Sequence, residues 1–150
     1  MALNFETRVA AYGLIVDQGR LLLAHFSVPG LAPGWTLPGG GLEFGEDPAT
    51  AAVREVFEET GYHVELTGLL GTDSVHMRPE QRSRPGDLPL HSFRLIYAAR
   101  LVSGMLRSEA DGSTDEARWF EFDEVTDLER VPLVDIGLRL WRERRGGHPR

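Results

Sequence analysis

The acidic segment REVFEETGY, residues 54–62, contains the side chains best suited to chemistry. Glu55, Glu58 and Glu59 follow Arg54 within little more than one helical turn. Like charges at this spacing destabilise a helix by about 0.2–0.5 kcal/mol per pair. A bound cation would offset that repulsion, because carboxylate oxygens are the ligands that hard cations such as Mg²⁺ and Mn²⁺ prefer. The cluster is therefore a candidate metal site, and a metal held there would also bind phosphate oxygens.

A helix over residues 48–60 is predicted to carry these carboxylates. Asp47 is a favourable N-cap, Pro48 suits the first helical position, and Gly61 suits the left-handed conformation that ends a helix. At about 100° per residue, one face of this helix is apolar and is expected to pack against a sheet. That face consists of Ala52, Val53, Val56 and Phe57. The three glutamates lie together on the other side, with Arg54 at the edge of their arc.

An acidic helix face has a simpler explanation, because most such faces are solvated and bind nothing. The segment REVFEE alone would favour that explanation. What favours a site is the glycine turn at 39–41, which precedes the helix at a defined distance and follows a short predicted strand.

The rest of the chain predicts a mixed sheet covered by helices, in a single α/β domain over residues 1–150. Two β-rich runs surround Asp17-Gln18-Gly19 and indicate a hairpin. Strands are expected at 63–75, 92–104 and 117–122, a helical turn at 123–128, and a closing amphipathic helix at 133–145. Residues 76–91 are polar and turn-rich, and are expected to form a mobile loop.

The composition excludes several functional classes. The 150 residues carry a net charge of −7, which argues against general nucleic-acid binding. The sequence lacks cysteine, which excludes disulfides and thiolate metal sites. No apolar run approaches the roughly 20 residues that a membrane helix needs, and the first residues do not have the pattern of a secretory signal. A cytoplasmic location is the resulting expectation.

The segment from Gly40 to Tyr62 resembles the signature of the Nudix hydrolase family, G-x5-E-x7-R-E-U-x-E-E-x-G-U, in which U is a bulky apolar residue. Its fixed positions are Gly40, Glu46, Arg54, Glu55, Glu58, Glu59 and Gly61. The one departure is Tyr62, an aromatic residue where an aliphatic one is usual. The flanking segments WTLPGG and EARWFEF also look like those of the family. The resemblance implies a Nudix-type α/β/α sandwich with a mixed β-sheet.

The same resemblance implies metal-dependent hydrolysis of a nucleoside diphosphate linked to a group X, with Mg²⁺ or Mn²⁺ as cofactor. Glu58 and Glu59 would be metal ligands, and Glu55 would be a further ligand or the base that activates water. Gly39 would offer its backbone carbonyl to the metal, and Gly40 would allow close approach.

Three further roles are implied. Arg54 would position Glu58 or Glu55 through a salt bridge, and Glu46 would hold the loop to the helix. Glu116 is a candidate extra ligand or alternative base, with Asp115 as its rival.

The sequence leaves X open. The proline that tends to mark the ADP-ribose subgroup is not in register, because Pro79 lies nearby but displaced, and the tyrosine that marks diadenosine polyphosphate enzymes is missing. A nucleoside triphosphate or modified nucleotide is the plainest expectation, with a small-molecule nucleotide rather than nucleic acid or membrane as partner. The alternative is a non-catalytic nucleotide-binding or regulatory module on the same fold. A homodimer would be common in the family, although no sequence feature indicates one here.

Overall fold

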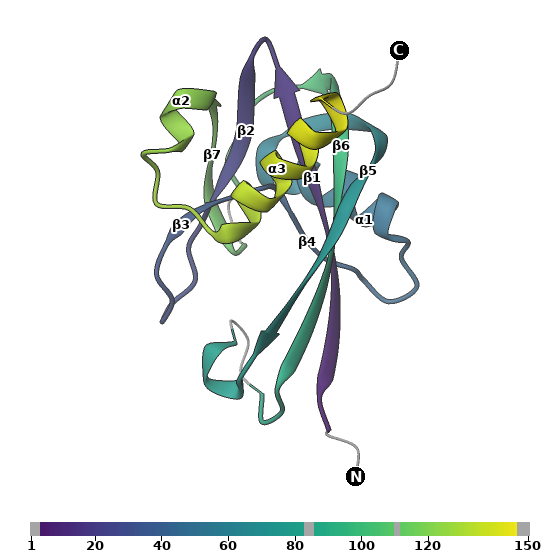
Figure 1. The fold of residues 1–150 in the computed structure, drawn as a ribbon, viewed down its shortest axis with the longest axis vertical. Helices are drawn as coiled ribbons and strands as arrows, with labels where there is room; N and C mark the ends of the chain where they lie inside the picture. The colour runs from purple at the N-terminus through teal and green to yellow at the C-terminus, as the bar shows by residue number, and fades with distance from the viewer. Residues whose placement is uncertain (1–3, 83–85, 110–111, 147–150) are drawn as a thin grey trace.

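The computed structural model describes residues 4–82, 86–109 and 112–146. Its elements follow one another along the chain as β1 (Glu6–Asp17), β2 (Arg20–Phe26), β3 (Gly34–Thr36), β4 (Gly39–Gly41), α1 (Pro48–Thr60), β5 (Tyr62–Met77), the 3₁₀ turn η1 (Pro79–Gln81), β6 (Leu90–Gly104), β7 (Thr114–Glu121), α2 (Phe122–Val125) and α3 (Pro132–Gly146) (Figure 1).

The strands form a mixed sheet in the order β3-β2-β1-β6-β5, with β4 paired to β1 and β7 paired to β2. The β1–β6 ladder is parallel, with Glu6 opposite Leu90 and Ile15 opposite Ala99. The other ladders between these strands are antiparallel. The predicted α/β fold with a mixed sheet is therefore confirmed.

The predicted hairpin joins β1 to β2. Gln18 and Gly19 both adopt positive φ, of 52° and 74°, as the two central residues of the hairpin turn. This backbone twist matches that of the two flanking strands, which explains the tight connection.

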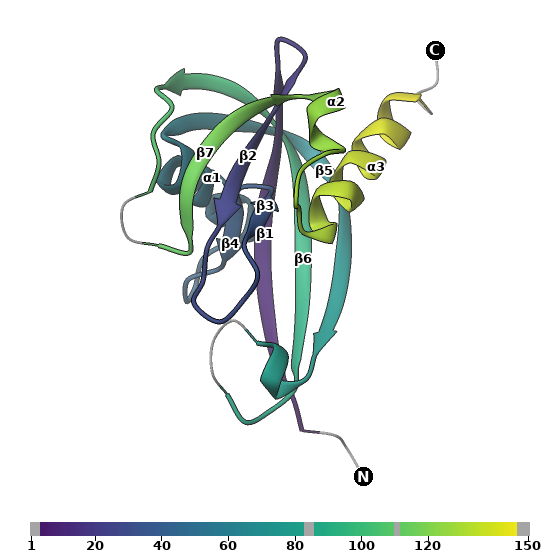
Figure 2. The same cartoon turned by 90° about the vertical axis from the view of Figure 1, so that its left-hand side faces the viewer.

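The two long helices cover opposite faces of the sheet, with α1 to the left and α3 to the right of the strands in Figure 2. A hydrophobic core lies on each face of the sheet, and successive residues of β1 contribute to opposite cores. Leu14 belongs to the cluster beneath α3, and Ile15 belongs to the cluster beneath α1. The predicted closing helix is confirmed as α3. Among the helices of the described ranges, none combines the length and apolar character needed to span a bilayer.

The connection between β5 and β6 is shorter than predicted. Residues 76–91 were expected to form one loop, but β5 continues to Met77, β6 begins at Leu90, and η1 lies between them. The ends of this segment were assigned wrongly, because His76 and Met77 pair with His91 and Leu90 in an antiparallel ladder whose side chains alternate into solvent. Residues 83–85 lie outside the described part of the chain.

Candidate functional site

The helix that carries the acidic cluster has the predicted boundaries. Pro48 occupies the first turn of α1 after Asp47. Gly61 ends the helix with a φ of 83°, and its N–H donates to the carbonyl of Phe57 at 2.9 Å. A residue with a side chain would be strained at this φ, so Gly61 fixes where the chain leaves the helix.

Strand β4 lies directly beside the helix carboxylates. Gly40 pairs with Ala11 of β1, and a Cβ atom added to Gly40 would lie 2.8 Å from the carboxyl carbon of Glu55. Real Cβ atoms do not approach other atoms this closely, so the absent side chain at Gly40 allows β1, β4 and Glu55 to pack together.

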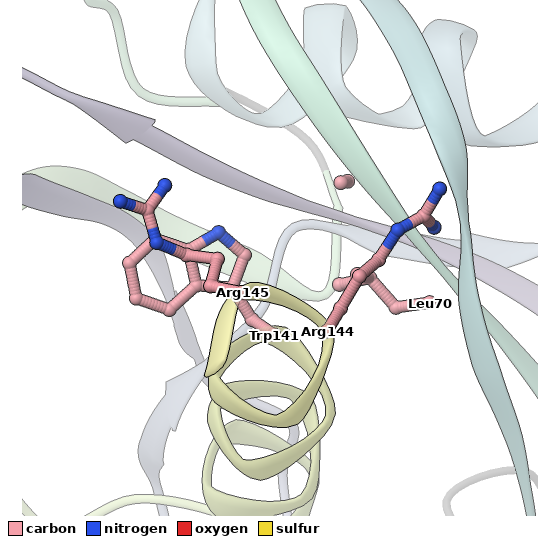
Figure 3. A pocket seen from close by; sticks show the side chains of 5 residues that line it. Leu70, Trp141, Arg144 and Arg145 are labelled. Atoms are coloured by element: carbon pink, nitrogen blue, oxygen red, sulfur yellow. The ribbon is translucent and has the colours of Figure 1, made fainter. Parts of the chain in front are cut away.

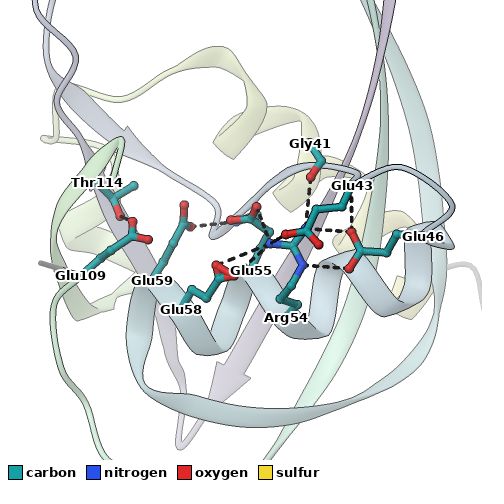
Figure 4. A network of polar contacts seen from close by, with 10 residues as sticks. Gly41, Glu43, Glu46, Arg54, Glu55, Glu58, Glu59, Glu109 and Thr114 are labelled. Atoms are coloured by element: carbon teal, nitrogen blue, oxygen red, sulfur yellow. Dashed lines mark hydrogen bonds and ion pairs between the residues drawn. The ribbon is translucent and has the colours of Figure 1, made fainter. Parts of the chain in front are cut away.

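Arg54 binds the carboxylates at the N-terminal side of the cluster (Figure 4). Its Nε and one Nη donate to the two oxygens of Glu46, both at 2.8 Å. The other Nη donates to Glu58 at 2.9 Å and to Glu55 at 3.1 Å. The hydrogen bond from Arg54, reinforced by the backbone N–H of Glu43, lowers the pKa of Glu46 to about 2. The predicted bracing roles of Arg54 and Glu46 agree with these contacts.

Glu59 is in the opposite situation, because it is buried and none of the arginines or histidines that the structure describes forms an ion pair with it. Its side chain is 3% exposed, and its Oε1 accepts a hydrogen bond of 2.9 Å from the backbone N–H of Gly39. Burial raises its pKa well above the ordinary value, and the charges of Glu55, Glu109 and Glu58 raise it further against the opposing effect of the Gly39 N–H. Burial also raises the pKa of Glu55, although Arg54 lowers it in part.

The burial of Glu59 differs from the helical-wheel prediction, which placed it away from the packed face of α1. The end of α1 is covered by β4 on one side and by the chain that follows β6 on the other. The backbone N–H of Arg107 donates to the carbonyl of Thr60 at 2.9 Å, which holds that following segment against the helix end.

This segment brings a fourth carboxylate to the cluster, that of Glu109 (Figure 4). The hydroxyl of the buried Thr114 donates to one Glu109 oxygen at 3.1 Å. The charge of Glu109 raises the pKa of both Glu55 and Glu59, which agrees with its position beside them. Glu109 was not predicted from the sequence, because its position beside the cluster depends on the path of the backbone past Thr60.

The two downstream residues predicted from the resemblance lie on β7 and have other partners. Glu116 accepts hydrogen bonds from the guanidinium of Arg118 on the same strand. Asp115 lies 2.8 Å from Nδ1 of His25. Across the described ranges, no hydrogen bond or ion pair joins Glu116 or Asp115 to the carboxylates of α1.

The carboxylates fit a divalent cation by their chemistry, but they are not preassembled around one. Within residues 4–82, 86–109 and 112–146, no three His, Asp or Glu side chains form a ready-made metal cage. The guanidinium of Arg54 lies among Glu46, Glu55 and Glu58 instead. Burial raises the pKa of both Glu59 and the half-buried Glu55, and their carboxylate oxygens are hard donors of the kind that a divalent cation prefers.

A separate hollow lies on the α3 side of the sheet and has a volume of about 400 Å³ (Figure 3). It is lined by Leu70, Ala98, Trp141, Arg144 and Arg145. Arg144 donates to the carbonyl of Leu69 at 2.9 Å, and Arg145 lies over Trp141 at 4.8 Å. Both cations therefore already have partners within the protein, and this hollow is distinct from the acidic cluster.

Comparison with known proteins places this geometry in a family. The family model described as NUDIX domain matches residues 5–138. A MutT-like protein of Streptomyces ambofaciens is 45% identical over 120 residues, covering 79% of this chain and 67% of that protein. An ADP-ribose pyrophosphatase of Methanocaldococcus jannaschii is 29% identical over 126 residues, covering 84% of this chain and 69% of that protein.

The solved structures agree. A NUDIX hydrolase from Nitrosomonas europaea superposes with a TM-score of 0.76 at 25% identity, covering 91% of this chain and 89% of that one. Coverage of other relatives is smaller: YjhB of Bacillus subtilis is 33% identical over 94 residues, and the match spans only 42% of its length. Because the family model matches nearly the whole chain and the signature lies on the helix and turn described above, the protein belongs to the Nudix family.

Proposed function

We propose that the protein is a metal-dependent hydrolase that cleaves the pyrophosphate bond of a nucleoside diphosphate linked to a group X. The observation that carries this proposal is the unneutralised end of the acidic cluster. Glu59 is buried beside Glu55, Glu58 and Glu109, and no cationic side chain that the structure describes pairs with it. Its ionised form therefore costs free energy unless a cation binds to these carboxylates. The type of reaction is inferred from the family, and two relatives that the chain matches are named ADP-ribose pyrophosphatase and RNA pyrophosphohydrolase.

The residues that would hold Mg²⁺ or Mn²⁺ are Glu58, Glu59, the carbonyl of Gly39, and Glu109. When bound, a divalent cation neutralises the pyrophosphate and lowers the pKa of a coordinated water. The N–H of Gly39 keeps the Glu59 carboxylate in place. The carboxylate of Glu55 accepts the proton from the attacking water, a role that suits a carboxylate whose pKa is raised by burial.

Arg54 acts as a positioning residue in this proposal. It binds Glu46, Glu55 and Glu58 at once, so it fixes the helix carboxylates relative to the loop that precedes α1. A planar guanidinium can hold several carboxylates in a fixed geometry, which a lysine cannot.

We propose Glu109 as the extra metal ligand, the role for which Glu116 was the candidate from the resemblance. Glu109 lies beside Glu59, with one oxygen held by Thr114, whereas Glu116 has Arg118 as its partner. The part of Glu116 or Asp115 in the reaction stays a prediction from the resemblance.

The substrate is proposed to be a nucleoside triphosphate or a modified nucleotide. The name of the 45% identical relative, MutT-like protein, gives no substrate, whereas ADP-ribose is the substrate named for the Methanocaldococcus relative. The displaced Pro79 disfavours ADP-ribose here. The net charge of −7 argues against general binding of nucleic acid.

Chromatographic measurement of product release tests this proposal. The panel contains nucleoside triphosphates, ADP-ribose, nucleotide sugars and dinucleoside polyphosphates, each with Mg²⁺ and with Mn²⁺. We expect turnover of at least one compound, abolished by EDTA and by Glu58→Gln, and the best substrate then identifies X. A folded protein that cleaves nothing in the panel would instead support the non-catalytic nucleotide-binding module.

A further inference from the structure

The guanidinium of Arg8 lacks a partner in a region where other charges are paired. Arg8 lies on β1 and is half-buried. In the described part of the chain it makes no hydrogen bond, ion pair or cation–π contact, and the other described arginine that lacks all three, Arg142, is exposed. Partly burying an unpaired charge costs free energy, so a bound anion would stabilise it.

Two acidic groups on the same face of the sheet as Arg8 already have cations. Glu6, two residues earlier on the same face of β1, lies 2.8 Å from Arg82. On the neighbouring strand β6, Ser92 is the register partner of Arg8, and Arg94 lies two residues further along that face. Arg94 is paired with Asp73 of β5. Neither Glu6 nor Asp73 is therefore free to pair with Arg8.

Arg8 also lies next to the glycine strand that borders the acidic cluster. A Cβ atom added to Gly41 would lie 3.1 Å from an Nη of Arg8, just as one added to Gly40 would lie 2.8 Å from the Glu55 carboxyl carbon. Successive residues of a strand face opposite sides. Arg8 and Glu55 therefore lie on opposite sides of β4, separated by a strand that has no side chains.

We propose that Arg8 binds a phosphate group of the substrate on the side of β4 away from Glu55. This inference rests on the proposed function, since it assigns Arg8 to the part of the nucleotide that the carboxylate cluster does not hold. Because Gly40 and Gly41 have no side chains, only the backbone of β4 lies between Arg8 and the carboxylate cluster. Arg8 would thus determine affinity for the phosphate chain and take no part in bond cleavage.

The kinetic test compares Arg8→Gln with Arg142→Gln, which removes the same charge from an exposed site on α3. With the best substrate of the panel, we expect Arg8→Gln to raise KM about 10- to 100-fold, as for the loss of a charge-assisted hydrogen bond. Its kcat should stay within about threefold, because Arg8 does not touch the reacting atoms. Circular dichroism should show that both variants fold as the wild type does.

A second measurement does not need turnover. The Nε–H signal of Arg8 is identified in a ¹⁵N-labelled sample by its absence from Arg8→Gln, and inorganic tripolyphosphate is then titrated in the presence of EDTA. The expected result is a shift of the Arg8 signal with none for Arg142. An unshifted Arg8 signal together with equal KM values for the two variants would overturn the inference. If the wild type cleaves nothing but the Arg8 signal shifts, the proposed hydrolysis fails while the phosphate site stands.

Discussion

The two ends of the acidic cluster on α1 differ in how their charge is balanced. At one end Arg54 binds Glu46, Glu55 and Glu58, and the pKa of Glu46 falls to about 2. At the other end Glu59 is buried with a backbone N–H as its donor, and its pKa rises well above the ordinary value. The first end is neutralised by a guanidinium of the protein itself, whereas the Glu59 carboxyl at the second end needs a proton or a bound cation to neutralise it. A strained charge arrangement of this kind indicates binding more clearly than the count of acidic residues does.

Removing one of the proposed metal ligands should have the largest effect. We expect Glu58→Gln and Glu59→Gln each to lower kcat/KM by about 1,000-fold or more, because ligand loss removes several kcal/mol of transition-state stabilisation. Steady-state kinetics with Mg²⁺ measures this. Both variants should keep the wild-type circular dichroism spectrum, and a folded Glu58→Gln protein with normal turnover would show that the ligand assignment is wrong.

Comparing Glu109 with Glu116 tests which of these two downstream carboxylates is a metal ligand. We expect Glu109→Gln to lower kcat/KM about 10- to 100-fold, since it lies beside Glu59, and Glu116→Gln to lower it by no more than about threefold. Mn²⁺ affinity, followed by electron paramagnetic resonance, should weaken for Glu109→Gln alone. The reverse order of the two variants would restore Glu116 as the site residue.

A third test measures the stability of the metal-free protein, which we expect Glu59→Gln to raise although it removes a proposed metal ligand. A carboxyl group whose pKa is raised on folding binds protons more tightly in the folded state. Metal-free stability therefore falls as pH rises from the ordinary value of 4.5 through the raised pKa of Glu59. Glu59→Gln keeps an oxygen for the Gly39 N–H but has no charge to bury.

At pH 8 in EDTA, we expect Glu59→Gln to melt a few degrees above the wild type, since about 1 kcal/mol shifts Tm by roughly 2–4 °C at this size. Saturating Mg²⁺ should reverse the order, because the wild type binds the metal more tightly. A wild type that is the more stable protein even in EDTA would contradict the interpretation of Glu59.

The smallest effect is expected at the end that Arg54 satisfies. Because the pKa of Glu46 is lowered from 4.5 to about 2, its contribution to stability is fully present above pH 4.5 and is lost as pH falls to about 2. Glu46→Gln should therefore lower Tm at pH 7 by about 2 °C, with solvent screening limiting the effect. The difference from the wild type should vanish near pH 2. Glu43→Gln is the control, since Glu43 is 70% exposed and lies 3.7 Å from Arg54.

The sequence predicted local structure well where short-range chemistry determines it. Pro48 and Gly61 lie at the two ends of α1 as predicted, although the Asp47 side chain makes no capping hydrogen bond, and Gln18 and Gly19 form the turn of the first hairpin. These features depend on backbone preferences of neighbouring residues, which a sequence shows directly. The family signature likewise lies within one turn and one helix.

The sequence could not predict features that depend on contacts between distant segments. Periodicity placed Glu59 on the outer side of α1, but the contact of Arg107 with Thr60 and the pairing of β4 with β1 bury it. The same Arg107 contact brings Glu109 to the cluster. Periodicity describes a helix as an isolated cylinder and contains no information about which segments later cover its end.

The parallel pairing of β1 with β6 has a consequence for how the protein folds. Glu6 pairs with Leu90, so the ladder closes a loop that contains β2, β3, β4, α1 and β5. Closing such a long loop costs more chain entropy than closing a hairpin, and folds rich in distant pairings form slowly. During synthesis, the strand that completes the centre of the sheet emerges from the ribosome well after α1. The helix that carries the acidic cluster is therefore synthesised before the sheet that supports it is complete. Glu59 becomes fully buried only after the chain beyond β6 has been made.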